Sequence, residues 1–269
     1  MSKMFWVRNF LNPGSSLVAS ASIAISILSL PLLNSSKALA DSYTLGTPVE
    51  VNNALQDLAN KGISPSQIAF APNGGWVIIY KGNGYISNNL RQDVLNKLSD
   101  LNKQNLTIDS IAFTPTGEWV IIYGIYGDGI ATSQNLPQEA VTALSDIRTK
   151  NKLIYAIAFG PNGSFVFVYD RNSYSVSKNI SPQVVADLSY VKTTRNEAVN
   201  TVAFSPDGNF IVIYDGDAYY PSQGIPKSLT AKIDEIVQNA VKNASASKII
   251  TSVGFTSDNG WTLLYHNVL

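Results

Sequence analysis

Carboxylates recur in this sequence at one kind of position, the short turns that follow pairs of apolar segments. Asp128, Asp170, Asp215 and Asp217 all occupy such turns, and Arg171 lies beside one of them. Several carboxylate oxygens gathered together could bind Ca²⁺, and two of them could serve as acid and base. Asp is also an ordinary turn residue, and the last two lack the further ligands of a calcium loop. We therefore predict ligand binding at these side chains, and neither a metal site nor catalysis.

Tyrosines form the second set of candidate residues. Tyr174, Tyr219 and Tyr220 lie close to hydroxyl residues such as Ser222, after the same turns. Exposed tyrosines in polar surroundings suit contacts with carbohydrate or peptide, because the ring packs and the hydroxyl forms hydrogen bonds. Packing at the edge of a sheet is the alternative, since aromatic residues are common in strands. The first interpretation makes these three residues part of a predicted ligand site.

The sequence lacks the residues of the common catalytic and metal centres. It has no Cys and a single His, His266, which we expect at the turn position of the last repeat. One imidazole cannot form a multi-histidine metal site. No nucleophile motif is present, so we expect no cofactor and favour a non-catalytic role.

These turns belong to an internal repeat, which is the strongest signal in the chain. The pattern reads apolar-small-Phe, small, Pro, x, Gly, x, aromatic, three apolar residues and Tyr, as in residues 68–80. It occurs five times, at intervals of about 45 residues, as expected of a repeat architecture. The shared phenylalanines are Phe70, Phe113, Phe159, Phe204 and Phe255.

Each copy of the pattern predicts a β-hairpin. Proline fixes φ at the start of a turn, and glycine two residues later suits a position with positive φ. Asn259 replaces this glycine in the last copy, and asparagine is among the residues that best tolerate such a conformation. The second strand, as in residues 76–80, is apolar on both faces and is therefore predicted to be buried on both.

A third strand and a helix are predicted after each hairpin. The third strands open near Tyr85, Ile130, Tyr174 and Tyr219. Helix-start signals follow, as at Ser181. The helices are amphipathic, with one apolar face in each. Residues predicted to share such faces are Leu90, Val94, Leu98 and Leu101, and Leu229, Ile233, Ile236 and Ala240, with Leu55 and Leu144 at matching places. The predicted fold is thus an α+β repeat protein of five βββα units.

The ends of the repeat region are complementary. The fifth copy has no third strand after its hairpin, whereas residues 42–45 form a strand with no hairpin before it and resemble residues 173–176. We predict that this strand completes the fifth unit and closes a propeller-like ring, which removes exposed sheet edges. The alternative is an open solenoid, which would need polar caps at both ends.

The first 40 residues resemble a secretory signal peptide. Lys3 and Arg8 precede an apolar stretch, and Ala38-Leu39-Ala40 supplies a small-x-small cleavage pattern. We expect cleavage after Ala40, export to the periplasm or the exterior, and a single five-repeat domain at residues 41–269 without membrane insertion. The leader's charged residues are all basic, so its loss leaves an acidic excess, which argues against a nucleic-acid partner.

Residues 202–211, with Phe-Ser-Pro-Asp-Gly at 204–208, resemble the repeats of TolB-type and WD40-like β-propellers. The resemblance is confined to the hairpins, because propeller blades have four strands and no recurrent helix. Five βββα units resemble the α/β-propeller of the pentein class instead. Catalytic penteins use Cys and His, and this chain has no Cys, so only the non-catalytic ring can be carried over.

These observations favour an exported, non-catalytic module that binds a cell-envelope protein or a glycan. A hydrolase using the carboxylates of the turns is the alternative, and a self-assembling surface or matrix component is another. The sequence leaves the oligomeric state open.

Overall fold

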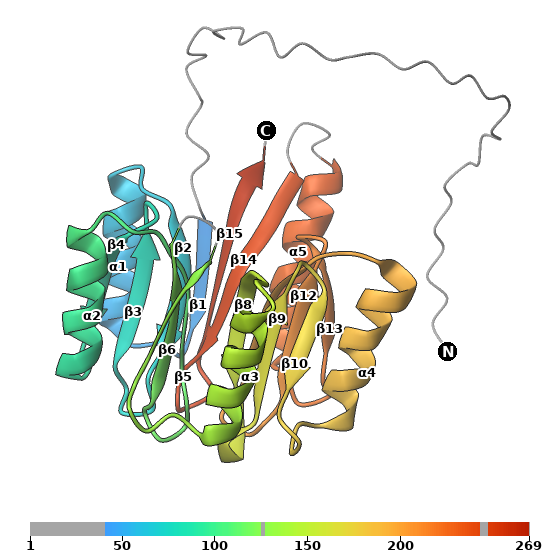
Figure 1. The fold of residues 1–269 in the computed structure, drawn as a ribbon. Helices are drawn as coiled ribbons and strands as arrows, with labels where there is room; N and C mark the ends of the chain where they lie inside the picture. Colours follow the sequence, from blue (N-terminus) through green and yellow to red (C-terminus); the bar gives the residue numbers. More distant parts are fainter. Residues whose placement is uncertain (1–40, 125–126, 243–246, 269) are drawn as a thin grey trace, which may run out of the picture. The chain divides into compact units, whose positions relative to one another are not determined.

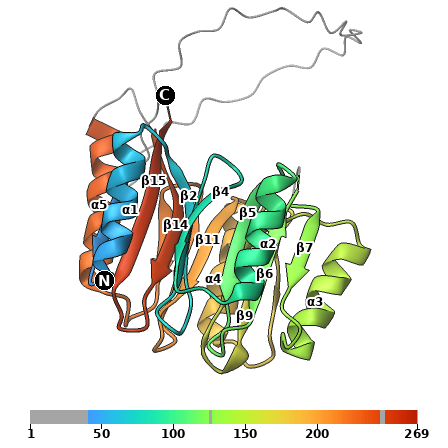
Figure 2. The same ribbon diagram turned by 90° about the vertical axis from the view of Figure 1, so that its left-hand side faces the viewer.

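The computed structural model describes residues 41–124, 127–242 and 247–268. The predicted leader and its cleavage site at Ala40 lie outside the described residues. Five three-stranded antiparallel sheets and five α-helices make up most of the described chain, with a short 3-10 helix at Pro161–Gly163 and a π-helical turn at Val191–Arg195 (Figures 1 and 2). The predicted order of two hairpin strands, a third strand and a helix is confirmed.

Four sheets consist of consecutive strands, and in each the second strand is central. These sheets are β2 (Pro65–Phe70), β3 (Trp76–Tyr80) and β4 (Gly84–Asn88); β5 (Ile108–Phe113), β6 (Trp119–Tyr123) and β7 (Gly129–Thr132); β8 (Ile154–Phe159), β9 (Phe165–Tyr169) and β10 (Ser173–Val176); and β11 (Val199–Phe204), β12 (Phe210–Tyr214) and β13 (Ala218–Pro221). The helices are α1 (Val49–Asn60), α2 (Gln92–Lys103), α3 (Gln138–Thr149), α4 (Pro182–Tyr190) and α5 (Lys227–Lys242).

The fifth sheet joins the two ends of the repeat region. Its order is β1 (Asp41–Leu45), β15 (Trp261–Val268) and β14 (Ser247–Phe255), and β1 runs antiparallel to β15 with Asp41 opposite Tyr265. The predicted completion of the last unit by the N-terminal strand is therefore confirmed.

Two details of the fifth sheet differ from the predictions. Tyr43 lies opposite Leu263 and Ser175 opposite Phe167, so Tyr43 matches Ser175 in register and not Tyr174. Sequence likeness between the strands misplaced β1 by one residue, which reverses the face of every side chain. His266 lies within β15 opposite Ile249 and not in a turn, because this strand continues where the other second strands reverse.

The hairpin turns have the predicted backbone. Gly74, Gly117 and Gly208 have φ of +80°, +87° and +81°, and Asn259 has φ of +61° in the equivalent position. Every first strand also contains a register shift near its start, as between Ile108 and Ser110, which the sequence analysis did not predict.

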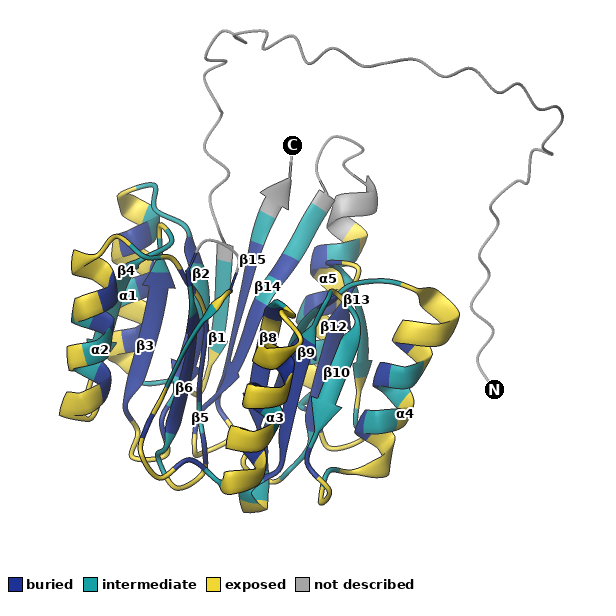
Figure 3. Cartoon of the chain, viewed as in Figure 1, coloured by how far each residue is buried: buried dark blue, intermediate teal, exposed yellow. Residues whose placement is uncertain are grey.

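The cores lie between sheets and helices, and the central strands are buried on both faces (Figure 3). Ile211 and Ile213 of β12 belong to a cluster with α5, whereas Val212 belongs to one with α4. Alternate residues of one strand thus contact two successive helices, as period-two alternation requires. Four of the five α-helices contribute a buried triad, such as Leu229, Ile233 and Ile236 of α5, and α4 contributes Val184 and Leu188, with Val191 buried directly after it.

Neighbouring sheets meet along their first strands. β2 lies beside β5, β5 beside β8, β8 beside β11, β11 beside β14, and β14 beside β2. Side chains connect these strands: Ile111 N donates to Gln67 Oε1 at 2.8 Å, and Ile68 N donates to Ser252 Oγ at 3.3 Å. The second turns add backbone bonds between units, for example from Ile108 N to Gly82 O at 2.7 Å. Polar contacts thus add to packing between the first and second sheets and between the fifth and first.

Candidate functional site

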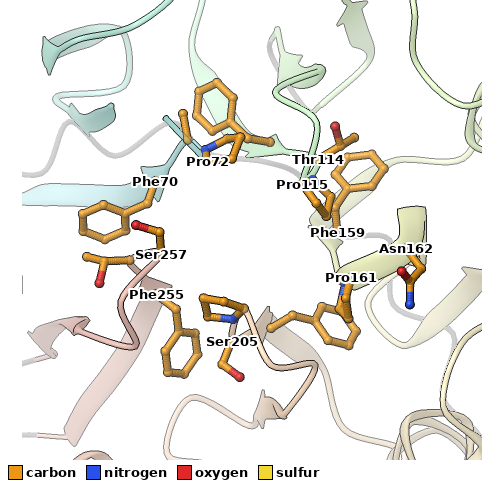
Figure 4. A pocket seen from close by; sticks show the side chains of 16 residues that line it. Phe70, Pro72, Thr114, Pro115, Phe159, Pro161, Asn162, Ser205, Phe255 and Ser257 are labelled. Carbon is orange, nitrogen blue, oxygen red and sulfur yellow. The ribbon is translucent and has the colours of Figure 1, made fainter. Parts of the chain in front are cut away.

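The five first turns surround one cavity of about 390 Å³, which we call the mouth cavity. Figure 4 shows their side chains arranged in a circle around an open centre. The lining comprises Phe70, Ala71, Pro72, Phe113, Thr114, Pro115, Phe159, Gly160, Pro161, Asn162, Phe204, Ser205, Pro206, Phe255, Thr256 and Ser257. These are the repeated Phe-small-Pro positions, so each hairpin contributes the same three places to one opening.

The lining of the mouth cavity combines aromatic and prolyl side chains with hydroxyl and amide groups, and none of the lining residues carries a charge. Beyond it, the first strands surround a narrower space of about 90 Å³. The prolines are held because each hairpin turn closes with a backbone bond, such as Ala71 N to Gly75 O at 2.7 Å. A rigid, uncharged concavity of this size suits an apolar group of a ligand.

Hydroxyl groups occupy three of the five places that follow the shared phenylalanine. Thr114 Oγ1 accepts a hydrogen bond from Glu118 N at 3.0 Å. Ser205 Oγ and Thr256 Oγ1 are buried and have no hydrogen-bond partner among the described residues. The five hairpins therefore share one backbone arrangement around the mouth cavity, but they differ in whether a hydroxyl group follows the shared phenylalanine.

The predicted carboxylates do not form one cluster. Asp170 pairs with Lys152 across 2.7 Å. The pKa of the Asp217 carboxyl is raised by burial and then by the neighbouring charge of Asp215. Within residues 41–124, 127–242 and 247–268, no three His, Asp or Glu side chains are arranged to hold a metal ion. The acidic turns are thus separate local sites.

Asp109 is a carboxylate that sequence reasoning missed. It occupies the register shift of β5, accepts a hydrogen bond from Gly127 N and lies near Asp128. Burial, assisted by the Asp128 charge, raises its pKa to about 6, against the opposing effect of the Gly127 bond. The recurrent irregularity at this strand position could not be recognised from residue types alone.

The predicted tyrosines contact the helices. Tyr219 Oη donates to Asp234 Oδ1 of α5 at 2.7 Å, and burial and this bond raise its pKa. Tyr220 stacks on Tyr214 with ring centroids 5.1 Å apart. The Nζ of Lys192 lies 5.9 Å from the ring centroid of Tyr174. All three predicted ligand residues are only partly exposed and contribute to core clusters.

In the described part of the chain, no helix combines the length and the apolar character that crossing a membrane requires. The His266 imidazole is half-buried in β15, and this burial lowers its pKa.

Comparison with known proteins agrees with the repeat pattern. The family model "WD domain, G-beta repeat" matches residues 188–217, which include the hairpin turn between β11 and β12. The chain carries a weak resemblance to WD40-like propeller repeats. The match covers the hairpin of β11 and β12 and the residues that lead into it from the end of α4. The structure contains a hairpin of this kind in each of its five units.

Similarity to solved structures is remote. One match is described as "YCF48 bound to D1 peptide", with 14% identity, 61% of this chain and 50% of that chain covered, and a TM-score of 0.24. The match spans half of that protein, and at this score it carries no argument about function. No curated protein matches the sequence.

Proposed function

We propose that residues 41–269 form a closed, propeller-like ring that is exported and binds a cell-envelope protein through the mouth cavity. In this proposal the leader is removed after Ala40, and the ring acts as a non-catalytic scaffold in the periplasm or outside the cell.

Two contacts support closure of the ring. β14 lies beside β2, which brings the fifth sheet against the first, and Ile68 N and Ser252 Oγ join them. β1 adds the third strand to the fifth sheet. An open solenoid would instead leave apolar first-strand surfaces uncovered at its two ends.

The observation that carries the proposed function is the uncharged mouth cavity formed by all five hairpins. Propeller-like rings present such convergent loops for recognition, because a rigid scaffold positions residues that differ between repeats. Aromatic and prolyl surfaces gain binding energy mainly by burying apolar groups of a partner. This chemistry favours apolar side chains of a protein over the hydroxyl-rich surface of a glycan.

The test places a charge in the mouth cavity. Affinity-tagged full chains carrying Pro72→Arg or Pro206→Arg are expressed in the native host, and proteins retained from the envelope fraction are quantified. We expect at least a tenfold loss of the retained partner, because an arginine would be desolvated against an apolar surface. Gln104→Arg, exposed beyond the end of α2, is the matched control and should retain the partner. Equal retention by all variants would refute binding at the mouth cavity, and retention of polysaccharide alone would replace the protein partner by a glycan.

A hydrolase is a second candidate, favoured by one observation. Asp109 and Asp128 are neighbouring carboxylates, and the raised pKa of Asp109, about 6, suits a general acid near neutral pH. A hydrolytic activity that is present in the native chain and lost in both Asp109→Asn and Asp128→Asn would establish this candidate.

A further inference from the structure

One position of the third strand distinguishes the fifth unit from the other four. In each unit, one residue stands directly before the repeated Tyr of the second strand. The third-strand residue that pairs with it is the position in question, and its side chain faces the helix that follows. Large residues hold this place in four units: Tyr85, Ile130, Tyr174 and Tyr219. Their side chains pack in the core clusters that contain α2, α3, α4 and α5. In the fifth sheet the residue opposite Leu264 is Ser42.

A groove lies where the larger side chain is missing. It has a volume of about 440 Å³ and separates β1 from α1, so we call it the β1–α1 groove. Its lining is Ser42, Tyr43, Thr44, Asn52, Leu55, Gln56, Ala59 and Tyr265. The volume falls within the range of about 300–1,000 Å³ that is typical of ligand sites. The groove is therefore a gap in the repeat pattern that is large enough for a ring.

The fourth unit shows which ring fits this place. There Tyr219 packs against α5, and its hydroxyl donates to Asp234 Oδ1 at 2.7 Å. Asp234 follows Ile233, the middle residue of the buried triad of α5, and Gln56 follows Leu55, the middle residue of the triad of α1. Gln56 thus occupies in α1 the place that Asp234 occupies in α5.

The polar groups of the groove suit a neutral hydroxyl. Gln56 Nε2 donates to Asn60 Oδ1 at 3.1 Å, a bond that uses the amide nitrogen and leaves the carbonyl oxygen as an acceptor. Thr44 Oγ1 of β1 donates to Asn52 Oδ1 of α1, so this hydrogen bond joins the two walls of the groove. Leu55, which is buried, and Ala59 supply apolar surface for the faces of a ring. No lining residue is charged, so a phenol matches the groove better than an anion or a cation.

We propose that the β1–α1 groove binds a phenol ring, supplied by a tyrosine side chain of a partner polypeptide. The ring occupies the place that Tyr219 fills in the fourth unit, and its hydroxyl donates to Gln56 Oε1. This inference goes beyond the proposed function, because the groove shares no lining residue with the mouth cavity and either site can exist without the other.

Binding is tested with N-acetyl-tyrosinamide and N-acetyl-phenylalaninamide by calorimetry on the chain exported and purified from its host. The tyrosine probe should bind several-fold more tightly than the phenylalanine probe, because only the phenol can donate a hydrogen bond to Gln56. Gln56→Leu should abolish this difference. The probe Gly-Tyr-Gly should bind at least as tightly as p-cresol if the ring comes from a polypeptide, and a clear preference for p-cresol would refute the polypeptide source.

Filling the groove provides the matched test. Ser42→Tyr restores the residue that other units carry, so it should weaken binding of N-acetyl-tyrosinamide at least tenfold and raise the unfolding temperature. Ser42→Ala keeps the gap and should bind the probe like the native chain. If Ser42→Tyr does not fold, Ala59→Leu serves in its place, because the larger side chain narrows the groove from the side of α1. Conversely, Tyr174→Ser should create a second binding site in the third unit. Failure of the native chain to bind the tyrosine probe, or unchanged binding by both filled variants, would overturn the proposal.

Discussion

Tyr43 is the residue of β1 whose removal best tests how firmly this strand holds the fifth sheet. Its ring stacks on Tyr265 with centroids 5.8 Å apart and an interplanar angle of 11°. Lys232 Nζ of α5 lies 4.0 Å from the Tyr43 ring centroid, and Lys248 Nζ lies 4.8 Å from that of Tyr265. Two lysines and two tyrosines from four elements therefore form one stack, and Tyr43→Ala removes its connection to β1.

The expected cost follows from three contributions. Loss of a partly buried ring costs about 1 kcal/mol, below the range for complete burial. The aromatic pair adds about 0.5–1.5 kcal/mol, and the lysine over the ring adds about 0.5–1 kcal/mol. We expect Tyr43→Ala to lower the free energy of unfolding by about 2–3.5 kcal/mol. For a domain of this size, that corresponds to a fall in unfolding temperature of about 5–10 °C.

Thermal unfolding followed by circular dichroism measures this change. The matched control is Ser175→Ala in β10, the position equivalent to Tyr43 in register, which should change the free energy of unfolding by less than about 0.5 kcal/mol. Hydrogen exchange should also accelerate in β15, since its outer bonds depend on β1. An unfolding temperature equal to that of the control would refute the view that this stack fastens β1 to the fifth sheet.

Three further predictions concern the latch strand, one acid and one turn. Deleting residues 41–47 should lower the unfolding temperature more than Tyr43→Ala and promote aggregation seen by light scattering, because an edge of β15 is exposed; unchanged stability would contradict the closed ring. Asp109→Asn should raise the unfolding temperature above about pH 6, because the raised pKa means that the native state resists ionisation of this group. That gain should vanish as the pH falls towards about 4, where Asp109 is protonated in both states, and a gain independent of pH would exclude this cause. Asn259→Ala should lower the free energy of unfolding by about 1–2 kcal/mol in chemical denaturation, because alanine is strained at positive φ and the hydrogen bond to Asp207 Oδ2 is lost. Asn259→Gly should cost less, because glycine adopts positive φ without strain. A larger cost for glycine than for alanine would contradict the turn argument.

The sequence was informative where a residue type has one dominant backbone preference. The Pro and Gly of each hairpin predicted its turn, and Asn259 in place of glycine marked the same conformation in the fifth copy. The unpaired strand before α1 and the incomplete fifth copy together predicted the pairing of β1 with β15. In each case the residue types were compatible with only one arrangement.

Features that depend on register could not be predicted in this way. Tyr43 was aligned with Tyr174 by sequence likeness, yet pairing with Leu263 places it one residue away and on the other face. The Asp109 site depends on an irregularity in β5, and the β1–α1 groove depends on which residue faces α1. Such relations arise from contacts between strands distant in sequence, so residue types alone leave them undetermined.

The start of the first strand has a mechanical consequence. Ile108, Val199 and Ile250 each donate their backbone N–H to a second-turn carbonyl of the preceding unit, at 2.7–2.8 Å. Pro65 occupies the equivalent place in β2 and has no N–H to donate, so the seam between the fifth and first sheets lacks this bond. Under a stretching force the molecule should part along this seam before any of those three junctions yields.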